Sequence, residues 1–113
     1  MDVAKMAKMA ENMRMRAQLK GEVTEVKVLM THPMETGRRK NDFGELIPAN
    51  FIQLVSATLN GKQVLEAQWG TGISKNPYLT FHLRGAKVGD VIHVNWTDNL
   101  GKTGAGEIVV TQA

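Results

Sequence analysis

The sequence predicts an all-β protein, an antiparallel β-sandwich of about seven strands preceded by a short N-terminal tail. Three observations favour this class. Short runs of residues alternate apolar and polar side chains, as strands with one buried face do. Turn-forming residues, among them Gly21 and the pair Asn60-Gly61, separate these runs. No long helical pattern interrupts them, so we expect strands alone to build the core.

The chain divides into a tail, residues 1–12, and one domain, residues 13–113. The tail lacks Gly and Pro, and its apolar residues follow helical spacing. This predicts a frayed helix or a flexible end, with an amphipathic docking helix as the alternative. From Met13 to Leu19 every second residue is apolar, so the first strand is predicted over residues 13–20.

The next strand is predicted over residues 23–30, and residues 51–59 and 62–69 should form a hairpin around Asn60-Gly61. A two-residue turn would mix apolar and charged side chains on each face, so we expect a three-residue loop with Gly61 left-handed at a bulge. The core face of this hairpin then holds Phe51, Val55, Ala57, Leu65, Ala67 and Trp69. The outer face holds Ile52, Leu54 and Val64, which form either a partner surface or ordinary exposed aliphatics.

Three further strands are predicted, over residues 78–83, 91–96 and 108–110, where apolar residues again alternate with polar ones. Seven short strands separated by turns are typical of an immunoglobulin-like sandwich. The Cys–Trp–Cys spacing of antibody domains is missing because the chain has no cysteine, so the prediction concerns the architecture alone.

This topology predicts where the loops gather. If each connection reverses the chain, one end of the sandwich collects the loops at residues 32–50, 70–77 and 98–103. The opposite end collects those at residues 21–22, 60–61 and 84–90. A loop of roughly nineteen residues, such as 32–50, is uncommon in a small domain and is more often functional than decorative. We therefore expect the working surface at the first of these ends.

Charge and composition exclude several functions. The formal net charge of +3 resides in the first 20 residues, and the remainder of the chain is neutral. A nucleic-acid-binding domain needs a basic face on its body, so this class is not expected. No apolar run approaches membrane-spanning length, so a membrane protein is not expected either. Without cysteine there is no thiol nucleophile and no disulfide.

The search for reactive groups predicts no catalytic residue, cofactor or metal site. Asp42-Phe43-Gly44 is interpreted as a turn. His82 and His93 are expected to point outward, and two imidazoles without a third ligand make a weak zinc site. Carboxylates at 35, 42 and 45 share one loop, which leaves a small enzyme as one alternative function.

Four segments resemble the SoxZ family, the cysteine-free subunit of the SoxYZ sulfur carrier of bacterial thiosulfate oxidation. They are His32-Pro33-Met34-Glu35-Thr36-Gly37, Leu46-Ile47-Pro48-Ala49, Lys75-Asn76-Pro77-Tyr78 and Trp96-Thr97-Asp98-Asn99-x-Gly101. The resemblance implies an immunoglobulin-like subunit without catalytic residues. It would pair with SoxY, whose arm cysteine carries the sulfur intermediates, and contact other Sox enzymes transiently. It also implies a periplasmic location, with export alongside a signal-bearing partner.

The resemblance and the shared loop end together predict the partner-binding residues. They are His32, Met34, Glu35, Thr36, Asn76, Pro77 and Tyr78, with Ile52 and Leu54 as a further candidate patch. Met34 and Tyr78 are expected to offer apolar contact area, Glu35 a charge for orientation, and Pro77 a fixed loop shape. The other alternative is a self-associating interaction or adhesion module with Ile52 and Leu54 at a symmetric interface.

Overall fold

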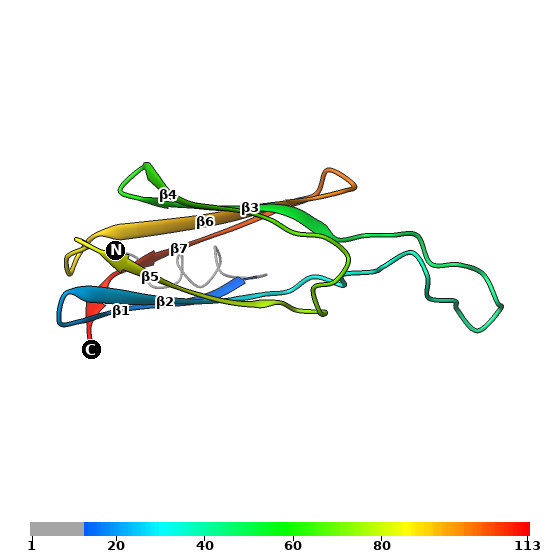
Figure 1. Ribbon diagram of the computed structural model, residues 1–113, viewed down its shortest axis with the longest axis horizontal. Coiled ribbons are helices and arrows are strands. Elements are labelled where there is room, and N and C mark those ends of the chain that lie inside the picture. The colour runs from blue at the N-terminus through cyan, green and yellow to red at the C-terminus, as the bar shows by residue number, and fades with distance from the viewer. Residues whose placement is uncertain (1–12) are drawn as a thin grey trace.

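The computed structural model describes residues 13–113, and the predicted tail, residues 1–12, lies outside this range. No helix in the described part of the chain is long and apolar enough to span a membrane. Eight strands follow one another (Figure 1): β1 (Met13–Lys20), β2 (Val23–Met30), β3 (Ile52–Leu59), β4 (Lys62–Gln68), β5 (Tyr78–Arg84), β6 (Val91–Asp98), β7 (Thr103–Val109) and β8 (Thr111–Gln112).

The strands form two four-stranded sheets, in the orders β5-β2-β1-β8 and β4-β3-β6-β7. Neighbours run antiparallel except β1 and β8, which are parallel. Placing β1, β2 and β5 in one sheet and β3, β6 and β7 in the other is the partition of immunoglobulin domains. The predicted immunoglobulin-like sandwich is therefore confirmed, and the short β8 is the strand that the residue pattern did not predict.

The core lies between the two sheets and is built from their inward-facing apolar side chains. Fully burying one such side chain stabilises the fold by about 1.5–3 kcal/mol, so the alternating strands are held face to face. The partly buried residues packed against it include Phe51, Leu65, Ala67 and Trp69, on the core face as predicted. The buried core comprises Met13, Ala17, Val26, Val28, Met30, Met34, Ile52, Val55, Ala57, Ile92, Val94, Trp96 and Val110.

The hairpin of β3 and β4 turns through Asn60 and Gly61 alone, because Leu59 pairs with Lys62, so the predicted three-residue loop is wrong. Both turn residues have positive φ, 50° and 87°. This is the two-residue turn that Asn-Gly favours, because its twist matches that of the strands. The extra residue lies farther along β4, at Val64, and beyond it the apolar positions pair as predicted.

Ile52 is fully buried in the core, so its predicted place on the outer face is wrong. A second bulge is the reason. Ile52 pairs with Asp98 and Leu54 with Thr97, which leaves Gln53 as an extra residue in β3. An extra residue reverses the alternation of inward and outward side chains at that point. Leu54 remains partly exposed on the outer face, as predicted.

The loops gather at two ends as the topology predicts. At one end, Asn60 donates its backbone N–H to the Val91 carbonyl, and its side-chain oxygen accepts from the Val91 N–H, both at 2.8 Å. At the other end, the loop after β2 contacts the loops before β5 and after β6, through the hydrogen bonds described below. We call this second end the loop end.

A projecting hairpin arm makes up most of the loop between β2 and β3. Figure 1 shows it extending well beyond the ends of the sheets, which gives a molecule of 52 × 28 × 22 Å. We define the hairpin arm as residues 36–49. Gly37 sits at its base with φ of 86°, and a Cβ there would lie 3.1 Å from the Cβ of Ala49. Glycine is therefore needed for the two sides of the arm to meet.

Candidate partner-binding site

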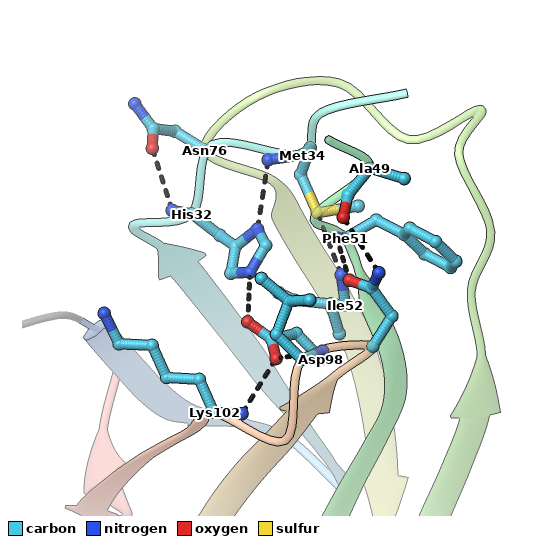
Figure 2. Close-up of polar contacts among 10 residues, drawn as sticks. His32, Met34, Ala49, Phe51, Ile52, Asn76, Asp98 and Lys102 are labelled. Carbon is cyan, nitrogen blue, oxygen red and sulfur yellow. Dashed lines mark hydrogen bonds and ion pairs between the residues drawn. The ribbon is translucent and has the colours of Figure 1, made fainter. Parts of the chain in front are cut away.

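The four segments that carry the family resemblance converge at the loop end, although they lie far apart in the chain. Figure 2 shows residues from three of these segments, His32, Asn76 and Asp98, within one hydrogen-bonded network, and Ala49 from the fourth beside it. The loops that were predicted to share one end therefore do so, and they contact one another directly.

His32 is the centre of this network and is buried, at 3% exposure. The Met34 N–H donates to its Nδ1 at 3.0 Å, so Nδ1 carries no proton. Nε2–H then donates to Asp98 Oδ2, also at 3.0 Å. The imidazole packs nearly perpendicular to the Trp96 indole, with ring centroids 5.0 Å apart. Both ring nitrogens are hydrogen-bonded and the ring packs against Trp96, so His32 connects the loops from inside the protein.

Asp98 ends β6 and organises the turn that follows it. Its Oδ1 accepts the backbone N–H groups of Leu100 at 2.9 Å and Lys102 at 2.8 Å, and Oδ2 accepts from His32. Burial alone would raise the pKa of Asp98. The hydrogen bonds from His32, Lys102 and Leu100 outweigh that effect and hold the pKa below its usual value. The network therefore contains a buried, fully hydrogen-bonded carboxylate.

Met34 is buried rather than presented to a partner. Its Sδ accepts the Ile52 N–H at 3.3 Å, which ties the loop to the start of β3 (Figure 2). Its φ of 47° lies in the left-handed region, where a side chain costs about 1–2 kcal/mol. Burial and the bond to His32 offset this cost. The apolar contact area expected of Met34 is thus used inside the protein.

Asn76 and Pro77 fix the neighbouring loop against β2. Asn76 and His32 exchange two hydrogen bonds, His32 N–H to Asn76 Oδ1 at 3.0 Å and Asn76 N–H to the His32 carbonyl at 2.9 Å. The carbonyl of Pro77, which is buried, accepts the Met30 N–H at 2.9 Å. Tyr78 follows with its side chain 61% exposed. Of the predicted contact residues in this segment, Tyr78 has the most side-chain surface to offer.

The base of the hairpin arm is tied to the same network. Asn99 accepts the Phe51 N–H at 2.8 Å and donates its side-chain amide to the Ala49 carbonyl at 2.9 Å. Glu35 and Asn50 pair across the base by two backbone hydrogen bonds, of 2.6 and 3.0 Å. The arm therefore leaves the sandwich from a fixed point.

Glu35 and Thr36 shape the first turn of the arm. Arg39 donates to the Glu35 carboxylate from Nη2 at 2.6 Å and from Nε at 3.2 Å. This hydrogen-bonded guanidinium lowers the pKa of Glu35 below its usual value. Thr36 Oγ1 accepts the Arg38 N–H at 3.1 Å. The charge predicted at Glu35 is present, and it is matched by Arg39.

The outer face of the β5-β2-β1 sheet carries a surface that the sequence analysis did not single out. Leu29 and Tyr78 pair across β2 and β5, and both are exposed. A shallow hollow there is lined by Arg14, Met15, Arg16, Lys27, Leu29 and Tyr78. We call it the Tyr78 surface. The sequence does contain a signal for this surface. In residues 13–20 and 23–30 every second side chain points into the core, so the side chains between them must share the outer face.

The histidines and carboxylates that the sequence analysis considered are spread over separate parts of the described chain. The described residues contain no group of three or more His, Asp or Glu side chains placed to hold a metal ion. His82 on β5 and His93 on β6 lie on different sheets, so they are not neighbours. Asp42 and Glu45 lie exposed on the arm, where Asn41 accepts the Phe43 and Glu45 N–H groups in the predicted turn.

Comparison with known proteins agrees with the motifs and the fold. The family model of the sulphur oxidation protein SoxZ matches residues 13–109. No curated protein matches the chain. The family match covers β1 through β7 and includes all four segments that converge at the loop end. On this evidence the chain belongs to the SoxZ family, and its role lies in sulfur oxidation by the Sox system.

Proposed function

We propose that the chain is the non-catalytic subunit of the SoxYZ sulfur carrier. It pairs with SoxY and stabilises it, while the arm cysteine of SoxY carries the sulfur intermediates of thiosulfate oxidation. It also helps to present SoxY to the other Sox enzymes. Its location is the periplasm, which it reaches together with a signal-bearing partner. Membership in the SoxZ family supports a role in Sox sulfur oxidation, and the pairing with SoxY is our inference.

The observation that carries this proposal is the convergence of the four family segments into one braced loop end. The side chains of His32 and Asp98 are buried and are used to fix loops. This arrangement suits a surface that is held in shape for a partner protein. The absence of cysteine also suits a carrier subunit, because a thiol beside a persulfide would risk exchange.

The Tyr78 surface is the part of the sandwich that we propose meets SoxY. Arg16 and Lys27 lie directly opposite each other on β1 and β2, and like charges in such pairs destabilise a sheet. Lys27 has Glu25 as an ion-pair partner at 3.6 Å. Within the described residues Arg14 and Arg16 have none. An acidic partner surface would relieve this repulsion while it covers Tyr78 and Leu29.

Replacing Tyr78 with alanine should weaken SoxY binding at least about tenfold, because an exposed aromatic side chain beside arginines is a typical interface anchor. The check is the dissociation constant of the purified pair, measured by calorimetry. Val88→Ala is the matched control, since Val88 is an exposed apolar residue that does not line the Tyr78 surface. Equal affinities for the Tyr78 variant and the wild type would remove this surface from the proposal.

The function itself is tested by the mass of the purified complex after co-expression with a SoxY-type protein. A stable one-to-one complex would support the carrier subunit. A folded chain that forms homodimers and does not bind SoxY would instead support the self-associating module. The symmetric interface predicted for this module comprised Ile52 and Leu54. Because Ile52 is buried, only Leu54 of the two is exposed for such an interface.

A further inference from the structure

A hollow opens at the loop end beside the His32 network. Its walls come from the loop after β2, the base of the hairpin arm, the loop before β5, and β6 with the turn that follows it. The lining includes Asn50, Lys75, Trp96 and Lys102, and the volume is about 540 Å³. A water molecule takes about 30 Å³ of liquid volume, so the hollow has room for more than one bridging water. We call it the basic hollow.

The two charged side chains of the lining are both cations. Lys75 and Lys102 are exposed, and neither has a carboxylate within ion-pair distance among the described residues. Figure 2 shows the Lys102 side chain extending away from Asp98, which is buried and already accepts three N–H groups. Lys75 lies close enough to Glu35 to lower its pKa, but the Glu35 carboxylate is held by Arg39 at 2.6 Å. Both lysines are therefore left for a negative charge from outside the protein.

Two polar groups of the same lining lack a partner inside the protein. The indole N–H of Trp96 is buried and donates to no acceptor among the described residues, and Asn50 Oδ1 is buried without a donor. An unsatisfied buried donor costs about 1–3 kcal/mol, and native proteins keep few of them. An acceptor in the hollow would satisfy Trp96, and Asn50 would meet it with its NH₂ group once the amide turns over. Water alone would satisfy these groups too, but it would not balance the two lysines.

We propose that the basic hollow binds a small divalent oxyanion of sulfur, such as sulfate or thiosulfate. Two ammonium groups match its two negative charges, and charge-assisted N–H···O bonds are the strong ones. The Trp96 indole, packed against His32, adds a donor in a fixed position. Because the chain belongs to a sulfur oxidation family, oxyanions of sulfur are the class of dianion that it meets. The inference goes beyond the pairing with SoxY and does not depend on it.

Occupation of the hollow would have a consequence at the surface. A bound dianion would cancel the charges of Lys75 and Lys102, which lie beside the loops that carry the family segments. The electrostatic field that another protein meets at the loop end would change with it, and so would the rate of a charge-steered encounter. The anion is thus expected to act as a ligand that adjusts this end of the molecule.

The test follows the indole N–H resonance of Trp96 by ¹H–¹⁵N NMR of the full chain during titration with sodium sulfate or sodium thiosulfate. Sodium chloride holds the ionic strength constant, because screening alone alters exposed charges. The chain has two tryptophans, so Trp69→Phe assigns the peak. We expect a saturable downfield shift of the Trp96 peak, with binding weakened about tenfold or more in Lys75→Gln and in Lys102→Gln. Lys62→Gln is the matched control, an exposed lysine at the opposite end of the sandwich.

The other outcomes would each overturn the proposal. A Trp96 resonance that moves with neither salt would assign the hollow to water. Sodium acetate that binds as tightly as sulfate would show a site for a carboxylate in place of a dianion. An equal loss of affinity in Lys62→Gln would reduce the effect to general surface charge. Failure of the chain to pair with SoxY is a separate measurement, and it would overturn the proposed function while leaving the basic hollow intact.

Discussion

Asp98→Ala is expected to lower the free energy of unfolding by about 3 kcal/mol, because one buried and two partly buried donors lose their acceptor at once. These donors are the imidazole N–H of His32 and the backbone N–H groups of Leu100 and Lys102. Asp98→Asn should cost about 2 kcal/mol. An amide can still accept at one oxygen, but its NH₂ group would face either the His32 proton or a backbone N–H. Urea unfolding followed by fluorescence measures both losses.

The pH dependence gives this prediction a second readout. The pKa of Asp98 in the folded state lies below its unfolded value of about 3.9, so the folded protein binds fewer protons just below that pH. The stability that Asp98 contributes is therefore present at neutral pH, begins to decline about one pH unit above the unfolded pKa, and is lost as the pH falls through the folded pKa. The wild type should lose more stability than Asp98→Asn on acidification across this range. If the free energies of unfolding of the wild type and Asp98→Asn fell equally with pH, the assigned network would be contradicted.

Asp42→Ala is the control for the same chemical change at an exposed site. Asp42 lies in the turn at the arm tip and has no hydrogen-bond or ion-pair partner among the described residues. Its replacement should change stability by less than about 0.5 kcal/mol. A comparable loss in both variants would mean that the carboxylate at 98 matters no more than a surface charge.

The sandwich was predictable because its strands obey a period of two, and that pattern depends only on which residues need burial. β1 and β2 appear at their predicted bounds for this reason. The pattern failed where a residue is inserted. At Gln53 and Val64 a bulge shifts the register by one, and Ile52 turned inward as a result. A bulge is set by pairing with neighbouring strands, which a single strand's sequence does not contain.

The candidate site was predictable in place but not in detail. Loop length and strand reversal were enough to locate the loop end, and the family segments were enough to name its residues. Whether a named residue faces outward or inward depends on partners distant in the chain. His32 meets Asp98, 66 positions away, and Met34 meets Ile52 through its sulfur. The hairpin arm was predicted only as a long loop, because its exposed tip has no apolar periodicity to indicate its path.

Gly104→Ala should destabilise the protein by about 3 kcal/mol or more, through overpacking beneath Trp96. Gly104 on β7 pairs directly with Trp96 on β6, and a Cβ at this position would overlap the indole ring at Nε1, Cε2 and Cζ2. The ring is 2% exposed and also packs against His32, so moving it would disturb the network that holds the loop end. Thermal unfolding and near-ultraviolet circular dichroism would record the loss. Gly72→Ala, in open space, should be nearly neutral.

A double-mutant cycle separates the clash from any other effect of the substitution. Trp96→Phe removes the indole atoms that the new methyl group would strike, so Gly104→Ala should cost less in that background than in the wild type. The difference between the two costs is the energy of the overlap, and we expect it to exceed about 1 kcal/mol. Equal costs would show that the ring is not what excludes a side chain at position 104. In that case the loop end could tolerate changes beneath Trp96, and its rigidity would have to come from the Asp98 network alone.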